Sequence, residues 1–88
     1  MFRMWGKLVK NNRTIQDTVA EIPYGSLTRT QMVFQALDEL CVRLDLGKPI
    51  WLDTNIREFQ LRDRTRFGQD QFIETIDFDF LEIQIIEE

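Results

Sequence analysis

The chain has 88 residues, of which 43% are hydrophobic and 30% are charged, and its formal net charge is −4. This length accommodates one domain, which we expect to span residues 1–88, and seven phenylalanines and two tryptophans are too many large apolar side chains for a disordered chain. The acidic balance argues against a dedicated nucleic-acid binder and against a membrane-surface module, because both need a dense basic surface.

The residue types that are present also exclude several kinds of chemistry. The chain has no histidine, so it lacks the commonest general base and a common metal ligand. Its one cysteine, Cys41, allows neither an intramolecular disulfide nor a tetrahedral zinc site. We therefore expect no enzyme activity, no cofactor and no metal. The lack of a signal-like apolar run and of disulfides predicts a location in the reducing cytoplasm.

Two strands are predicted at the start of the chain. The segment Phe2 to Lys10 alternates between apolar and polar residues, which is typical of a half-buried strand. The two faces carry Phe2, Met4 and Leu8 on one side and Arg3, Trp5, Lys7 and Val9 on the other. A polar turn over residues 10–13 and a weaker strand from about Thr14 to Ile22 would complete a hairpin.

The clearest predicted element is a helix from about Arg29 to Leu46. Thr28 and Gln31 have the spacing of a capping box, while Gly47 is suited to the left-handed residue that ends a helix. An apolar stripe follows helical spacing and comprises Val33, Phe34, Leu37, Leu40, Cys41 and Leu44. Cys41 is therefore expected to be a small buried hydrophobe and not a nucleophile.

The second half of the chain is less regular. Residues 50–52 fit either a brief strand or a buried connection, and Asn55 resembles the N-cap of a short helix that ends near Arg62. Residues 63–70 are predicted to form a loop. A final strand is expected from about Ile73 to Ile86, and its alternation changes phase between Phe80 and Leu81, as a β-bulge or a sharp bend would produce.

The charges of the two ends predict how these strands are arranged. Residues 1–16 contain four basic and no acidic residues, whereas residues 67–88 contain seven acidic and no basic residues. Opposite charges on neighbouring strands are stabilising, so we expect the final strand beside the first. The predicted fold is α+β, in the order ββα(α)β, with a small mixed sheet made of the N-terminal hairpin plus the C-terminal strand packed on one long helix. This order of elements resembles the β-grasp fold.

Four short segments carry a resemblance to known sequences. They are Pro-Ile-Trp-Leu at 49–52, Thr-Arg-Phe at 65–67, Asp70 with Phe-Ile-Glu at 72–74, and Phe-Asp-Phe-Leu at 78–81. Through them the chain resembles a group of short uncharacterised proteins of Gram-positive, clostridial-type bacteria. The resemblance implies a bacterial, cytoplasmic origin and carries over no function and no site.

The candidate interaction surface combines basic and aromatic residues, namely Arg57, Arg62, Arg64, Arg66, Phe67 and Trp5. The arginine and phenylalanine side chains of residues 57–67 are suited to gripping phosphate and stacking on bases, and equally to docking an acidic protein segment. A second alternative is a divalent-metal site made of Asp70, Asp77 and Asp79, or of a similar trio from an acidic cluster that also contains Glu74 and Glu82. Carboxylates that alternate with apolar residues are, however, typical of the solvated face of a strand.

These observations favour a small non-enzymatic protein-binding or accessory module. Its expected partner is an unidentified protein or a second copy of the chain in a homodimer, with no membrane contact. Nucleic-acid association through the arginine segment is the alternative, although the net charge of −4 opposes it.

Overall fold

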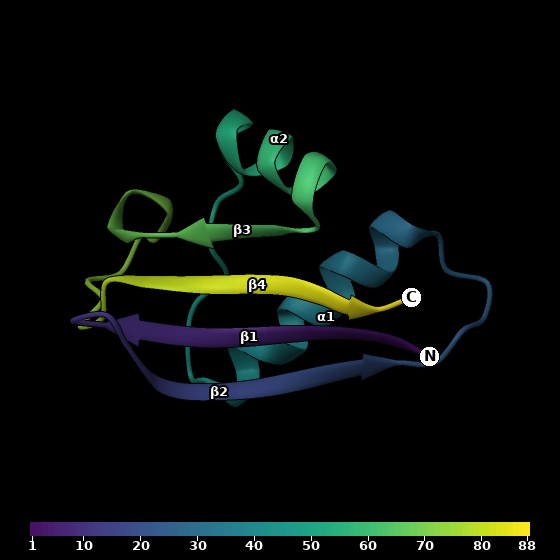
Figure 1. Cartoon of the computed structure of the whole chain (residues 1–88), viewed down its shortest axis with the longest axis horizontal. Coiled ribbons are helices and arrows are strands. Elements are labelled where there is room, and N and C mark those ends of the chain that lie inside the picture. The colour runs from purple at the N-terminus through teal and green to yellow at the C-terminus, as the bar shows by residue number, and fades with distance from the viewer.

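Four strands and two helices make up an α+β fold in the computed structural model, which describes all 88 residues. The elements in chain order are β1 (Phe2–Lys10), β2 (Arg13–Ile22), α1 (Arg29–Arg43), α2 (Asp53–Arg62), β3 (Arg64–Phe67), a 3₁₀ turn (Gln69–Gln71) and β4 (Phe80–Glu87). The strands form one sheet in the order β2-β1-β4-β3 (Figure 1). The predicted α+β class and hairpin are confirmed, and the final strand does lie beside the first.

The direction of the strands differs from the prediction. All three neighbouring pairs are antiparallel, so the sheet is not mixed. Residues 63–70 were predicted to form a loop, but Arg64–Phe67 form the strand β3, which pairs antiparallel with β4. The resemblance to the β-grasp fold is therefore one of element order, since the first and last strands of a β-grasp run parallel and those of this chain do not.

Helix α1 starts as predicted and stops earlier. The hydroxyl of Thr28 accepts a hydrogen bond from the backbone N–H of Gln31 at 3.2 Å, and the Gln31 side chain accepts one from the N–H of Thr28 at 2.9 Å. The helix ends at Arg43, because Asp45, and not Gly47, takes the left-handed conformation with φ 57°. The N–H groups of Asp45 and Leu46 bond to the carbonyls of Val42 and Cys41, which is the Schellman pattern.

The structure selects one of the two alternatives for residues 50–52 and corrects two further predictions for the second half. Residues 50–52 form a connection and no strand, and the N–H of Ile50 bonds to the carbonyl of Gln71 at 2.7 Å. The N-cap of α2 is Leu52, and Asn55 is the third helical residue whose side chain accepts the Leu52 N–H. Strand β4 begins at Phe80, so the phase change there marks the start of the strand and not a bulge or bend inside it.

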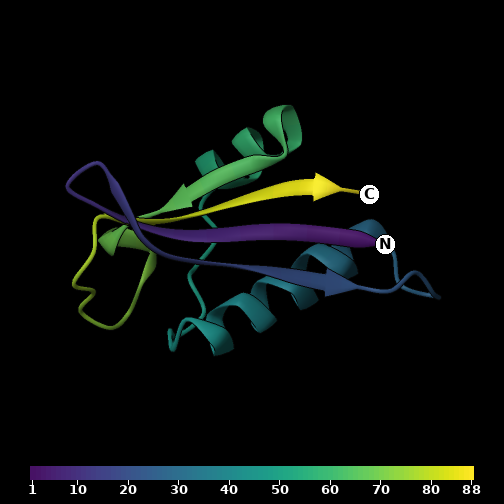
Figure 2. The same cartoon turned by 60° about the horizontal axis from the view of Figure 1, so that its bottom comes forward.

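The two helices occupy different positions around the sheet. Helix α1 packs across one face, whereas α2 lies beside β3 at the edge of the sheet (Figures 1 and 2). The core lies between α1 and the sheet and contains 18 buried hydrophobic residues. Cys41 is among them at 2% exposure, so its predicted burial is confirmed. Neither helix has the length and apolar character that crossing a bilayer requires.

The opposite face of the sheet carries no helix (Figure 2). The side chains of Trp5, Lys7 and Val9 point to this open face of β1 and are only partly buried, while their neighbours Met4 and Leu8 point into the core. The alternation predicted for β1 is thereby confirmed. The open face and the α2 edge together determine where polar side chains gather.

Candidate functional site

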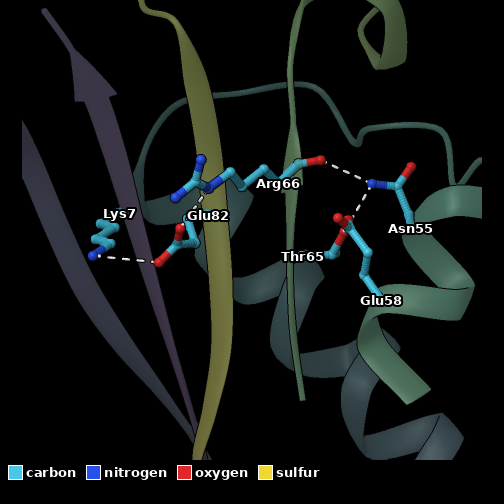
Figure 3. Close-up of polar contacts among 6 residues, drawn as sticks. All are labelled: Lys7, Asn55, Glu58, Thr65, Arg66 and Glu82. Carbon is cyan, nitrogen blue, oxygen red and sulfur yellow. Dashed lines mark hydrogen bonds and ion pairs between the residues drawn. The ribbon is translucent and has the colours of Figure 1, made fainter. Parts of the chain in front are cut away.

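A carboxylate lies between two cations on the open face of the sheet. Lys7 of β1 and Arg66 of β3 are both register partners of Glu82, which lies on β4 between them. Arg66 Nε donates to Glu82 Oε1 at 2.8 Å, and Lys7 Nζ lies 3.3 Å from Glu82 Oε2 (Figure 3). Opposite charges on the first and last strands therefore meet as the sequence predicted, and one acid links three strands.

The environment of Glu82 determines its protonation. Burial of this side chain, which is only 9% exposed, by itself raises the pKa of the carboxyl group. The hydrogen bonds from Arg66 and Lys7 and their positive charges outweigh burial and lower the pKa below its ordinary value. Glu82 is therefore ionised at neutral pH and neutralises the two cations beside it.

A polar cavity of about 400 Å³ lies between these charges and α2. No hydrophobic residue lines it. Its charged lining consists of Lys7, Glu58, Arg62, Arg64, Arg66 and Glu82, and the hydroxyl-bearing Thr65 completes it. We call this site the arginine cavity.

The turn between α2 and β3 brings the three arginines of the cavity together. Asp63 adopts a left-handed conformation with φ 56°, which ends α2 directly after Arg62 and starts β3 at Arg64. Successive residues of a strand point to opposite faces, so Arg64 and Arg66 share the exposed side of β3 while Thr65 is buried. One tight turn therefore gathers cations from a helix end and a strand.

A buried amide holds α2 against β3. Asn55 is 1% exposed, and its Nδ2 donates to the hydroxyl of Thr65 at 3.0 Å and to the carbonyl of Arg66 at 2.8 Å (Figure 3). The hydroxyl of Thr65 in turn donates to Glu58 at 2.7 Å. This network positions the wall of the arginine cavity and covers the outer edge of β3, which is otherwise open to pairing.

Two guanidinium groups of the cavity have no partner in the chain. Arg62 and Arg64 are exposed, and neither makes an ion pair or a side-chain hydrogen bond. Lys7 and Arg66, by contrast, share the carboxylate of Glu82. Four cations and two carboxylates line the cavity, so it is locally positive although the whole chain carries −4.

The structure separates the six residues of the predicted interaction surface. Arg62, Arg64 and Arg66 line one cavity, whereas Arg57 of α2 does not. Phe67 is fully buried, with its ring centroid 5.1 Å from that of Trp51. Phe67 cannot stack on a ligand, because side chains alternate along β3 and that of Phe67 points into the core.

Trp5 lies on the open face, outside the arginine cavity. Its indole N–H donates to Asp17 at 2.9 Å, and Lys7 Nζ lies 4.6 Å from the centre of its ring. Three residues that line the arginine cavity were not predicted as part of the interaction surface, namely Lys7, Glu58 and Glu82. The basic alternation of the first strand was the available signal for Lys7, but the strand register that joins it to the arginines was not visible.

The acidic residues are not gathered into a group of metal ligands. Asp79 accepts the backbone N–H of Asn11 at 2.9 Å and so secures the β1–β2 turn. No group of three or more acidic or thiol side chains is arranged to hold a metal ion. The structure therefore does not bring Asp70, Asp77 and Asp79 together, as a divalent-metal site would require.

A second, apolar cavity of about 330 Å³ lies between α1 and α2. Phe34, Trp51, Ile56 and Phe59 contribute to its lining, and Phe34 and Ile56 are each nearly half exposed. The Trp51 ring meets those of Phe34 and Phe59 edge to face, at centroid distances of 5.9 and 5.6 Å. This cavity is an extension of the aromatic core that reaches the surface.

Comparison with known protein families, with curated proteins and with solved structures gives no match.

Proposed function

We propose that this chain is a protein-binding module that receives an acidic segment of a partner protein in the arginine cavity. The observation that carries the proposal is the convergence of Arg62 and Arg64 in a wholly polar cavity without any counter-charge of their own. A guanidinium group presents paired N–H donors that match a carboxylate, which makes such an arginine suited to recognising acidic side chains.

Nucleic-acid binding is supported less well by the same residues. A single-stranded nucleic acid needs exposed aromatic rings on which its bases stack. Phe67 is in the core, and the partly exposed Phe80 already has the Arg66 guanidinium 4.5 Å from its ring centre. The net charge of −4 also disfavours a long phosphate backbone, because a polyanion is repelled by the chain as a whole.

Fluorescence anisotropy with a labelled peptide tests the proposal. A short peptide rich in Asp and Glu is titrated with the protein in low-salt buffer, alongside the same peptide with Asn and Gln. We expect binding of the acidic peptide alone, weakened about tenfold or more by the double substitution Arg62→Gln and Arg64→Gln. Arg57→Gln is the matched control, since Arg57 is on the same helix but outside the cavity.

Two results would overturn this function. One is the absence of binding to the acidic peptide at low salt. The other is tighter binding of a single-stranded oligonucleotide that the Arg62→Gln and Arg64→Gln variant loses, since this would assign the cavity to nucleic acid. Both variants should keep the thermal unfolding of the parent chain, because the exchanged guanidinium groups make no ion pair or hydrogen bond within it.

We further propose that the module works in the cytoplasm, because its one thiol is free and buried and the fold uses no disulfide. The homodimer stays a prediction, and sedimentation of the chain over a range of concentrations tests it. Fractionation of the native cells with an antibody against the chain tests the location.

A further inference from the structure

We propose that the arginine cavity selects a phosphorylated side chain, phosphoserine or phosphothreonine, within the acidic segment of its partner. This inference rests on the function proposed above and names the group that the cavity recognises. It follows from the charge, the donor geometry and the lining of the cavity.

The excess charge of the cavity matches a phosphate monoester. Lys7 and Arg66 are neutralised in part by Glu82 at 3.3 and 2.8 Å, whereas Arg62 and Arg64 have no acidic partner. The lining therefore has two more positive than negative side chains. A phosphorylated side chain carries about −1.5 to −2 at neutral pH, whereas Asp or Glu carries one negative charge and would leave one guanidinium uncompensated.

The free donors also suit the shape of a phosphate. Arg62 and Arg64 flank the left-handed residue Asp63, so their side chains reach one cavity from the helix end and from the strand. Each guanidinium group can donate two parallel hydrogen bonds, and a phosphate monoester offers three terminal oxygens to receive them. A carboxylate offers only two oxygens, so it presents fewer acceptor sites to the two guanidinium groups than a phosphate does.

The lining disfavours other carriers of phosphate. A nucleotide base or a lipid chain needs apolar or aromatic contacts, and no hydrophobic residue lines the cavity. A volume of about 400 Å³ has room for a phosphate on a short side chain together with neighbouring backbone. The acidic partner segment would continue across the open face, where Lys7 and Arg66 lie.

Glu58 provides a second variant, which tests whether the anion binds beside this carboxylate. Its carboxylate lines the cavity and accepts the hydroxyl of Thr65 at 2.7 Å, so it is the one acid there without a cation of its own. It therefore repels an incoming anion. Glu58→Gln keeps a hydrogen-bond acceptor for Thr65 and removes the charge, so it should strengthen binding of the phosphorylated ligand about threefold or more.

The experiment compares three peptides that differ only at their central residue, which is Ser, Asp or phosphoserine. We expect the phosphoserine peptide to bind about tenfold tighter than the Asp peptide at pH 7.5. The difference in affinity between the phosphoserine and Asp peptides should shrink at pH 5. The second phosphate pKa is about 6, so the phosphoserine peptide loses negative charge at that pH. Arg62→Gln and Arg64→Gln should remove the advantage, and Arg57→Gln should preserve it.

The outcomes separate this inference from the function on which it rests. Equal binding of the Asp and phosphoserine peptides would overturn the phosphate inference and leave the acidic-segment function standing. No binding of either peptide would overturn both. Competition by inorganic phosphate as strong as that of the phosphoserine peptide would also overturn the inference, because the cavity would then recognise the free ion and no protein segment.

Discussion

Gly6 on β1 and Leu40 on α1 are in contact where the helix crosses the sheet. A Cβ atom added at Gly6 would lie 3.0 Å from Leu40 Cδ1 and 3.1 Å from Leu40 Cδ2, closer than ordinary packing allows. Leu40 is fully buried, so it has no free space into which it can turn. The glycine therefore determines how closely α1 approaches the centre of the sheet.

Gly6→Ala should destabilise the chain by about 1–2 kcal/mol, because the added methyl group overpacks the helix–sheet contact. The free energy of unfolding in urea measures this loss. The cost should be smaller in a Leu40→Ala background, which a double-mutant cycle would detect. Gly25→Ala is the control, since a Cβ at Gly25 meets nothing within 4 Å and its φ is not positive. An equal loss at both glycines would contradict the packing argument.

Glu82→Gln should lower the free energy of unfolding by about 2 kcal/mol at pH 7, because it removes the shared partner of Lys7 and Arg66. Glu21→Gln is a suitable control, since the Glu21–Arg3 pair at 3.2 Å is half exposed and should contribute below about 0.5 kcal/mol.

The lowered pKa of Glu82 predicts how the stability of the chain depends on pH. Its pKa in the folded chain lies below its ordinary value of 4.5, so its stabilising effect is complete above that pH. The effect is lost as the pH falls through the folded pKa. Urea unfolding from pH 7 to pH 2 should therefore show a larger loss for the parent chain than for Glu82→Gln. If the free energies of unfolding of the two chains fell in parallel with pH, Glu82 would not contribute to the loss of stability in acid.

Asn55→Ala should destabilise the chain by about 2–3 kcal/mol, because it leaves the partly buried carbonyl of Arg66 and the N–H of Leu52 without their side-chain partners. Asn55→Asp keeps the acceptor for Leu52 but loses both donations to β3, so it should also be destabilising. Thermal unfolding measures both effects. Thr54→Ala, at the exposed neighbouring position, should change the unfolding temperature little.

Cys41 should resist modification in the folded chain. Burial raises the pKa of its thiol to about 11, with Asp38 adding a smaller effect, so the thiolate is scarce at pH 8. We expect a thiol reagent at pH 8 to react many times faster in urea than in buffer. Fast reaction of the folded chain would show that α1 opens readily or that the thiol is not in the core.

The sequence by itself determined the elements whose signals are local. The capping box of Thr28 marks where α1 begins, and the apolar stripe recurs along the whole helix, so both signals can be read without knowing any tertiary contact. The alternation of β1 likewise determines which side chains enter the core. The opposite charges at the two ends also indicated that β1 and β4 are neighbours.

Only the tertiary structure decided how the arginine cavity is assembled. Four residues, Arg64–Phe67, are too few for a strand periodicity, and they are extended because β4 pairs with one of their edges while α2 covers the other. Gly47, which seemed suited to end α1, instead donates its N–H to Glu74 at 2.6 Å. The contact of Lys7 with Glu82 depends on strand register, which is set by packing between segments far apart in the chain.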